Sequence, residues 1–290
     1  MTELLTLTND QLEVKISTLG AEVQSAKNLQ DGFEYIWQAD KQYWGRHAPI
    51  LFPFIGRSNE NSYLLNGQKY AMKQHGFLRD YDFALEEVKK DSVVLTFVSN
   101  AETLEVYPYD FTVRISYQLQ GKQLLISYAI TNNTDQEMYY SLGFHPAFNL
   151  EGDLSNYRLN FEPQTNSLTE LLIDPAPFRS GKEAEVALKD SSLPVSYPML
   201  DAGLRIYDAQ KLREVTLVSG YQHAIRLELS DFPYLAIWSP EEKHAPFLCV
   251  EGFRGLPDQY GKVGEIADKK GEQVISPERG EVVSTSISFF

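Results

Sequence analysis

Residues 111–119 read FTVRISYQL, a stretch in which apolar and polar side chains alternate without a break. Every odd-numbered position is an aromatic or branched aliphatic residue, and every even-numbered position is Thr, Arg, Ser or Gln. Side chains on a β-strand point to opposite faces with this period of two. The stretch therefore predicts a strand with one face in a core and the other face in water.

Similar strand patterns recur along the chain. They are LEVKIS at 12–17, SVVLTFVS at 92–99, QLLISYAITN at 123–132 and AIRLELSD at 224–231. β-Branched and aromatic residues are frequent in several of them, as expected for strands that pack in a core. The sequences NGQKY at 66–70 and GKQL at 121–124 are typical of hairpin turns.

These patterns predict one all-β domain over residues 1–290, a large sandwich of two stacked antiparallel sheets. With 43% hydrophobic residues, the chain can bury a core of that size. Only residues 198–212, PMLDAGLRIYDAQKL, suggest a short helix. Residues 151–200 are rich in Pro, Asp and Ser, which predicts long loops.

The chain is acidic, with a formal net charge of -14. Such a surface repels nucleic acid and anionic membranes, so neither is an expected partner. Cys249 is the single cysteine, which excludes an intrachain disulfide. The opening MTELLTLTND does not resemble a signal peptide, and the longest apolar run, APILFPFI at 48–55, is too short to span a bilayer. We therefore expect a cytoplasmic protein.

Several common site motifs are missing from the sequence. It contains no H-x-H, HExxH or C-x-x-C spacing, which argues against a zinc site. It also lacks G-x-S-x-G, a P-loop and a dinucleotide-binding glycine pattern. We therefore predict neither a metal ion nor an organic cofactor, which leaves histidines and carboxylates to perform the chemistry.

Two of the five histidines lie among apolar and aromatic residues. They are His75 in QHGFLRD and His145 in YYSLGFHPAFNL, where a predicted strand ends. Pro146 restricts His145 to an extended backbone and cannot donate to a β ladder. His223 and His244 lie in polar turns, where we expect them to be solvated.

The segment FLCVEGFRGLPD, residues 247–258, contains a carboxylate directly after an apolar run. Strand alternation would place Phe247, Cys249 and Glu251 on one face. A carboxylate on a core face is costly unless it is paired or functional. Its burial would raise its pKa toward the range of a general base at neutral pH.

Each of these residues also has an ordinary structural explanation. A histidine at the end of a strand is more often a hydrogen-bonded structural residue than a catalyst. Glu251 could instead pair with Arg254 or Arg57 at the rim of a sheet. Arg57, in FIGRSNEN, could be a loop cation that binds backbone carbonyls. No single residue therefore identifies the function.

Taken together, four segments resemble the aldose 1-epimerase, or galactose mutarotase, family, and most closely its LacX-type branch of lactic-acid bacteria. They are PILFPFIGR at 49–57, QHGFLRD at 74–80, GFHPAFNL at 143–150 and FLCVEGFRGLPD at 247–258. ISTLGAEVQSAK, near the start, is also similar to the opening strands of the family. The order and spacing of an H-x-x-F-N element and an apolar-Cys-apolar-Glu element are the most specific part of the match, which extends over nearly the whole chain.

This resemblance implies a β-supersandwich with a sugar cleft, and cofactor-free interconversion of the α and β anomers of an aldose. Glu251 would be the base. His145 and His75 would face the sugar, with His145 as the acid that protonates the ring oxygen. Arg57 would hold a sugar hydroxyl, and Asp201 is the candidate for a hydroxyl-binding aspartate.

Two further residues of the matching motifs, Asn149 and Arg79, are candidates for binding the monosaccharide. Aromatic residues are candidates for packing on the C–H face of the sugar. Phe77, Phe148 and Trp238 are the ones near the motifs, although each could equally belong to the core.

The sequence also departs from the family pattern, since GFRG follows Glu251 where the common form continues with a proline and a tryptophan. Arg46 and Arg57 lie in the early segment, and Arg79 follows His75. Arg57 and Arg79 could bind a phosphate, so a hexose 6-phosphate is an alternative substrate. A non-catalytic sugar-binding protein is a second alternative. A glycoside hydrolase or lyase ranks lowest, because only one good carboxylate candidate is present. The sequence does not distinguish between oligomeric states.

Overall fold

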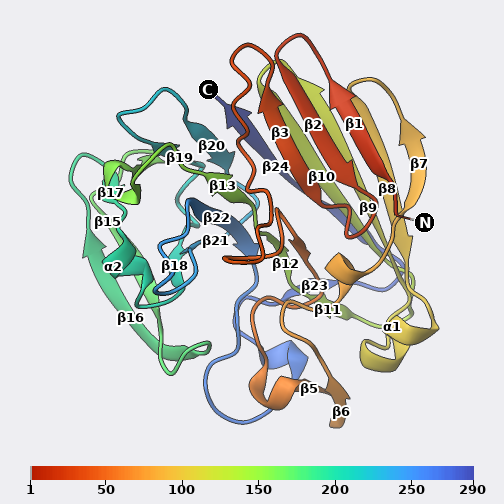
Figure 1. Ribbon diagram of the computed structural model, residues 1–290. Helices are drawn as coiled ribbons and strands as arrows, with labels where there is room; N and C mark the ends of the chain where they lie inside the picture. Colours follow the sequence, from red (N-terminus) through yellow and green to blue (C-terminus); the bar gives the residue numbers. More distant parts are fainter. Residues whose placement is uncertain (1) are drawn as a thin grey trace.

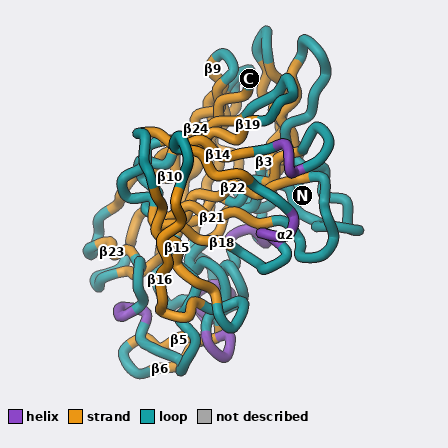
Figure 2. The backbone as a smooth tube through the Cα atoms, turned by 90° about the vertical axis from the view of Figure 1, so that its left-hand side faces the viewer, coloured by secondary structure: helices purple, strands orange, loops and turns teal. Residues whose placement is uncertain are grey.

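β-Structure dominates the computed structural model, which describes residues 2–290 (Figure 1). Within these residues the two α-helices are short, Ala101–Val106 (α1) and Tyr197–Leu200 (α2). Figure 2, turned by 90°, shows how strands and loops make up the body of the molecule. No helix in residues 2–290 has the length and apolarity needed to cross a membrane.

The larger of the two main sheets has nine antiparallel strands in the order β17-β14-β19-β20-β24-β10-β9-β8-β7. They are β7 (Ala84–Val88), β8 (Ser92–Val98), β9 (Phe111–Gln120), β10 (Gln123–Asn132), β14 (Arg158–Glu162), β17 (Ser192–Pro194), β19 (Glu214–Val218), β20 (Ile225–Glu228) and β24 (Gly280–Phe289). The β9–β10 hairpin pairs Leu119 with Leu124 and Phe111 with Asn132, as its alternating sequence predicts.

The second main sheet follows the order β16-β15-β18-β21-β22-β12-β4, and β13 also pairs with β22. Its strands are β4 (Ile50–Leu51), β12 (Leu142–Phe144), β13 (Ala147–Asn149), β15 (Ser167–Ile173), β16 (Arg179–Ala187), β18 (Arg205–Asp208), β21 (Tyr234–Trp238) and β22 (Phe247–Arg254). β22 is therefore bordered by β21 on one side and by β12 and β13 on the other.

Three smaller sheets complete the fold. They are β1 (Leu4–Thr8) with β2 (Leu12–Ser17) and β3 (Val23–Asn28), β5 (Ser62–Leu65) with β6 (Gln68–Ala71), and β11 (Met138–Tyr140) with β23 (Gln273–Ile275). Figure 1 shows the β1–β3 sheet, in red, lying over the β8–β10 part of the nine-stranded sheet. The hydroxyl group of Tyr117 on β9 donates to Ala21 O at 2.6 Å and joins these two layers.

β22 is buried on both faces and separates the main core from the candidate site. Leu248 and Val250 pack in the main core with side chains of β9 and β10. Cys249 and Phe253 point the other way, into two smaller apolar clusters. Glu251 lies between them on that second face, because side chains alternate along a strand. A strand with two buried faces explains the continuous apolar run FLCV.

The predicted fold class is confirmed, and β2 and β10 have the bounds that the sequence indicated. The prediction of long loops over residues 151–200 is wrong, since β14, β15, β16 and β17 lie there. Much of β16 is exposed on both faces, so the apolar alternation that marks a strand is weak. The predicted helix over 198–212 is only partly correct, because α2 ends at Leu200 and β18 follows.

Candidate active site

The candidate site begins with the register between β22 and its neighbours. β12 ends paired with Gly252 of β22, and β13 resumes opposite Cys249. The register is continuous across this break, which places His145 opposite Glu251. Cross-strand partners share one face of a sheet, so these two side chains meet although more than a hundred residues separate them.

The backbone around His145 is held from both sides. His145 N donates to Pro49 O at 3.1 Å, beside β4. Pro146 has no N–H to donate, but its carbonyl accepts from Val250 N of β22 at 3.3 Å. The proline thus interrupts the ladder between β12 and β13 while the chain stays in register. His145 is presented on the face of Glu251.

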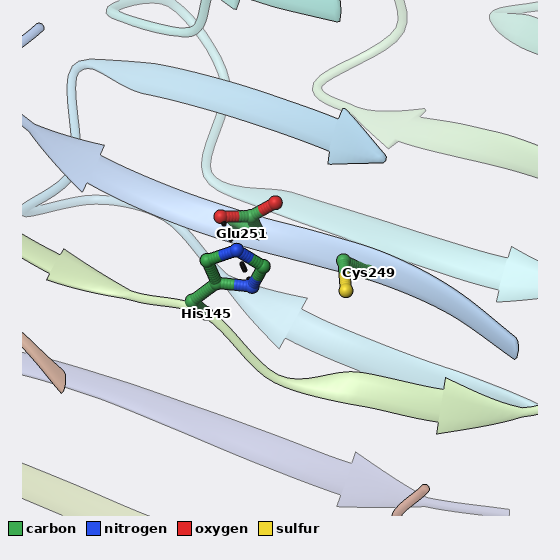
Figure 3. A group of neighbouring side chains, drawn as sticks. All are labelled: His145, Cys249 and Glu251. Carbon is green, nitrogen blue, oxygen red and sulfur yellow. Dashed lines mark ion pairs between the residues drawn. The ribbon is translucent and has the colours of Figure 1, made fainter. Parts of the chain in front are cut away.

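Glu251 and His145 form a close, buried pair (Figure 3). His145 Nδ1 lies 3.3 Å from Glu251 Oε2, and the two residues are 7% and 0% exposed. Neither this nitrogen nor either carboxylate oxygen has a hydrogen-bond partner within residues 2–290. The contact therefore has the distance of an ion pair without the geometry of a hydrogen bond. Buried polar atoms without partners are rare, and they mark this pair as a place where a ligand supplies the partners.

Burial determines which protonation states this pair favours. It raises the pKa of Glu251 well above its ordinary value. It also lowers the pKa of His145 to about 3, and the positive charge of Arg79 adds to that effect. Both shifts favour the uncharged forms, a carboxylic acid and a neutral imidazole. Transfer of the one proton from Glu251 to His145 gives an ion pair with the same total charge.

His75 reaches the same site from a strained turn. Its φ is +66°, and Gly76 follows with φ +69°. A Cβ at position 76 would lie 2.1 Å from Phe52 O, so only glycine fits there. His75 N donates to Gly56 O at 2.8 Å, and Gly56 N donates to His75 Nδ1 at 3.1 Å. These bonds fix the ring and the left-handed conformation that a histidine rarely adopts.

The hydrogen bond at Nδ1 also defines the tautomer of His75. Burial, reinforced by the nearby His145 and Arg79, lowers the pKa of His75 well below its usual range, so the ring is neutral. Since Nδ1 accepts from Gly56, the ring proton lies on Nε2. The rings of His75 and His145 are 5.8 Å apart, nearly perpendicular. His75 is therefore a hydrogen-bond donor beside the Glu251–His145 pair.

A cleft of about 470 Å³ opens above these residues. His75, His145 and Glu251 all line it, together with Trp44 and Trp238. The Trp44 ring stacks on His145 at 5.0 Å, and Trp238 meets the same imidazole edge-on at 6.0 Å. Two indoles beside polar, proton-transferring groups form a surface on which the C–H face of a sugar ring can pack.

The three arginines near the cleft differ in whether they line it and in whether they are already paired. Arg79 lines it, and its Nη2 donates to Gln74 O at 2.9 Å, whereas its buried Nε has no partner. Arg46 also lines the cleft but pairs with Asp80 at 2.7 Å. Arg57 lies outside it, in a neighbouring hollow, and contacts the cleft wall through Gln74 Oε1 at 3.3 Å. The structure thus brings Arg79, rather than Arg57, directly into the cleft.

Two residues predicted to bind substrate do not line the cleft. Asn149 donates its side-chain amide to Glu34 O and Ile36 O at 2.8 and 2.9 Å, so it holds a neighbouring backbone segment. Asp201 accepts from Glu242 N at 2.7 Å, behind the rim of the cleft. Both side chains have structural partners and lie outside the cleft lining, so their predicted role in substrate binding stays a prediction.

The aromatic candidates separate in the same way. Phe148 is fully buried in the main core, and Phe77 is nearly so. Trp238 is the one of the three that lines the cleft. Trp44 was not among the sequence candidates. A large aromatic residue in a polar, glycine-containing loop, QYWGRH at 42–47, was the signal that could have identified Trp44.

Cys249 lies beside the pair but does not line the cleft. Ligand atoms of His145, Cys249 and Glu251 all fall within 4.8 Å of one another (Figure 3). Burial and the nearby Glu251 raise the pKa of the Cys249 thiol well above its ordinary value, so it stays protonated. The thiol takes no part in proton transfer to a ligand in the cleft.

The two histidines assigned to solvated turns differ from each other. The His244 side chain is 62% exposed, as expected. His223 is only 10% exposed, stacks on Phe33 at 3.9 Å and contacts two carboxylates, so the expectation of a solvated residue is wrong. The carboxylates are Asp31 and Glu151, which come from two separate loops.

The sandwich is that of galactose mutarotase-like proteins. The fold matches the crystal structure of a galactose mutarotase-like protein from Lactobacillus casei with a TM-score of 0.96 and 40% identity, over 99% of this chain and 100% of that one. A galactose mutarotase related enzyme from Lactobacillus acidophilus matches with a TM-score of 0.93 and 30% identity, over 99% and 97% of the two chains.

The chain belongs to the aldose 1-epimerase family, whose model matches residues 3–277. It is 34% identical to the plasmid-encoded protein LacX of Lactococcus lactis over 285 residues, which cover 91% of each chain. The resemblance to the LacX-type branch is therefore confirmed. The family and the fold are those of isomerases of the mutarotase type.

Proposed function

We propose that this protein interconverts the α and β anomers of a free aldose of the galactose or glucose type, without a cofactor. The observation that supports this most strongly is the Glu251–His145 pair. It lies at the floor of a cleft, it is buried, and its carboxylate and Nδ1 have no hydrogen-bond partners. A base and an acid in contact are what opening a pyranose ring requires.

The proton balance follows from the neutral state of the pair. Transfer of the Glu251 proton to His145 Nδ1, 3.3 Å away, produces a carboxylate and an imidazolium. The carboxylate takes the proton from the C1 hydroxyl, and the imidazolium gives its Nε2 proton to the ring oxygen. The C1–O5 bond breaks, C1 becomes an aldehyde, and one proton has moved from O1 to O5.

Ring closure reverses these transfers after rotation about the C1–C2 bond. Glu251 returns a proton to O1, and His145 accepts the O5 proton, so the pair ends as it began. The pair and the sugar remain neutral in total throughout, which suits a buried site where net charge is costly.

The other residues of the cleft orient the sugar. His75, with its proton on Nε2, donates toward the ring oxygen or an adjacent hydroxyl and holds the reacting geometry. Trp44 and Trp238 pack on the C–H face of the ring. Arg79 donates to hydroxyl groups with guanidinium hydrogens that the protein leaves free.

One specific observation supports a second candidate, a hexose 6-phosphate. Burial and the charge of Arg46 lower the pKa of Arg79 to about 10, so it stays cationic at neutral pH. No carboxylate forms an ion pair with Arg79 within the described residues, although the chain has a net charge of -14. A free guanidinium in a sugar cleft is a phosphate-binding group.

Polarimetry on freshly dissolved α-D-galactose and α-D-glucose, with and without protein, tests the proposal. Anomer exchange of the two 6-phosphates is followed by NMR in parallel. We expect faster equilibration of a free sugar. Acceleration of the phosphates alone would establish the second candidate, and no acceleration of any sugar by folded protein would overturn both.

A further inference from the structure

The floor of the cleft brings together three side chains that are typical ligands of thiophilic metal ions. Cys249 and Glu251 are two positions apart on β22 and share its cleft-side face, and His145 lies opposite Glu251. Their ligand atoms lie within 4.8 Å of one another, and all three residues are buried (Figure 3). Because the fold, rather than sequence spacing, brings them together, a search for zinc motifs does not detect them.

The unsatisfied atoms of the group point to a ligand. His145 Nδ1 and both Glu251 oxygens are buried and make no hydrogen bond to residues 2–290. The Nδ1–Oε2 distance is 3.3 Å. Two ligands of a tetrahedral zinc ion, each at its usual bond length, lie about 3.4 Å apart. This nitrogen and oxygen are therefore already spaced for a shared metal ion.

The third ligand requires a small movement. A thiolate sulfur and an imidazole nitrogen on one zinc ion are separated by about 3.6 Å. Cys249 Sγ therefore needs to approach by about 1.2 Å at most from its place within 4.8 Å of the other ligand atoms. Rotation about χ1 and relaxation of neighbouring side chains can supply such a shift. His145 and Glu251 line the cleft, so an ion bound to them would be reached from it.

We propose that His145, Cys249 and Glu251 bind a thiophilic divalent cation such as Zn²⁺ or Cd²⁺, and that the bound ion inhibits the enzyme. Binding displaces the protons of the Cys249 thiol and the Glu251 carboxylic acid. The resulting set of one thiolate, one imidazole and one carboxylate suits these ions and disfavours Mg²⁺ and Ca²⁺. The ion occupies the lone pairs that would accept and relay the proton of the sugar. Arg79 lines the same cleft, and its positive charge limits the affinity.

The proposed metal site is inferred from the positions of His145, Cys249 and Glu251. Inhibition by the bound ion rests in addition on the proposed function. Binding is tested with Co²⁺ and Cd²⁺ by the thiolate-to-metal charge-transfer absorption, which is independent of any activity. Wild-type protein should show this band at one ion per chain. Cys249→Ser, which nearly preserves the side-chain volume, and Cys249→Ala should both lose it while circular dichroism shows an intact fold.

Inhibition is tested with Zn²⁺ on the same three proteins. Zn²⁺ should slow wild-type turnover about tenfold or more, and a chelator should restore it. Both Cys249 variants should keep basal turnover and need at least about tenfold more Zn²⁺ for the same effect. Absence of the absorption band, or equal Zn²⁺ inhibition of the variants, would overturn the proposal. A band without any mutarotase activity would instead refute the proposed function and leave the metal site standing.

Discussion

Two contacts between a histidine and carboxylates in residues 2–290 are built in opposite ways, the buried one of His145 with Glu251 and the partly exposed one of His223 with Asp31 and Glu151. His145 faces Glu251 at 3.3 Å with no hydrogen bond at Nδ1 or at either carboxylate oxygen. His223 Nε2 hydrogen-bonds to Asp31 at 3.0 Å, whereas His223 Nδ1 lies 2.9 Å from Glu151 without the geometry of a hydrogen bond. Glu151 also accepts from His223 N at 3.0 Å.

The difference appears in the charge of each histidine. Burial dominates at His145 and lowers its pKa to about 3. At His223, the interactions with Asp31 and Glu151 outweigh the opposing effect of burial and raise the pKa. The first contact thus favours the uncharged forms and lacks hydrogen-bond partners in residues 2–290, whereas the second favours the imidazolium and has a hydrogen bond to Asp31. On the proposed function, the contact that lacks hydrogen-bond partners serves proton transfer, whereas the contact of His223 with its carboxylates serves stability.

The largest expected effect follows replacement of Glu251. Glu251→Gln removes the base, and we expect kcat to fall about a thousandfold in polarimetry. The matched control is Glu151→Gln, which alters the carboxylate of the other contact and should leave turnover within about twofold. Similar losses in both variants would contradict the division of roles.

His145→Gln should have the next largest effect. This substitution removes the acid that protonates the ring oxygen and the Nδ1 atom that accepts the Glu251 proton. We expect kcat to fall about a hundredfold. His75→Gln retains a hydrogen-bond donor, so we expect a smaller loss, about tenfold. Both are measured by polarimetry after circular dichroism has shown an intact fold. A larger loss at position 75 than at position 145 would reverse their assigned roles.

The pH dependence of kcat/KM sharpens the comparison without a substitution. Because the pKa of His145 is lowered, an extra proton binds to the pair only at acidic pH. The rate should therefore show no decline around the ordinary histidine value of 6.5, and should fall only toward the His145 value of about 3. A decline of kcat/KM on acidification that is centred near pH 6.5 would show that the pKa of His145 is not lowered. The fold is checked at each pH.

The second contact should matter for stability alone. The pKa of His223 is raised, so its stabilising effect is complete below 6.5 and is lost as the pH rises through the folded-state value. We expect His223→Gln to lower the unfolding temperature by about 2–4 °C at pH 6 and by less at alkaline pH. Turnover should be unchanged. Equal destabilisation at both pH values would rule out a charged His223.

The smallest effect is expected at Asp201, which lies behind the cleft. Its carboxylate accepts a backbone hydrogen bond from Glu242 and does not line the cleft. Asp201→Asn keeps an acceptor at that position, so turnover measured by polarimetry should stay within about twofold. A large loss of turnover would restore the aspartate as a substrate-binding residue.

Local patterns made much of the fold predictable. β9 and β10 alternate strictly and are joined by a glycine turn, so their sequence alone defines the hairpin. β14 and β17 were missed because they are short and pair with each other across the intervening β15–β16 hairpin, and β16 was missed because it is largely exposed. Strands that depend on distant partners leave a weak trace in their own sequence.

The candidate site was predictable only as separate pieces. Motifs indicated Glu251, His145 and His75, and the structure brings all three to one cleft. The register that sets Glu251 against His145 depends on a ladder interrupted at Pro146, which no local pattern reveals. The contact of Trp44 with His145 joins a loop to a sheet and was likewise invisible.

The central claim is that Glu251 and His145 handle the sugar proton as one unit. It is tested most directly by comparing anomerisation rates of Glu251→Gln, His145→Gln and the double variant. Residues that act as a unit are not additive, so the double variant should be at most about tenfold slower than the slower single variant. Multiplication of the two single losses would contradict the account and show two independent groups.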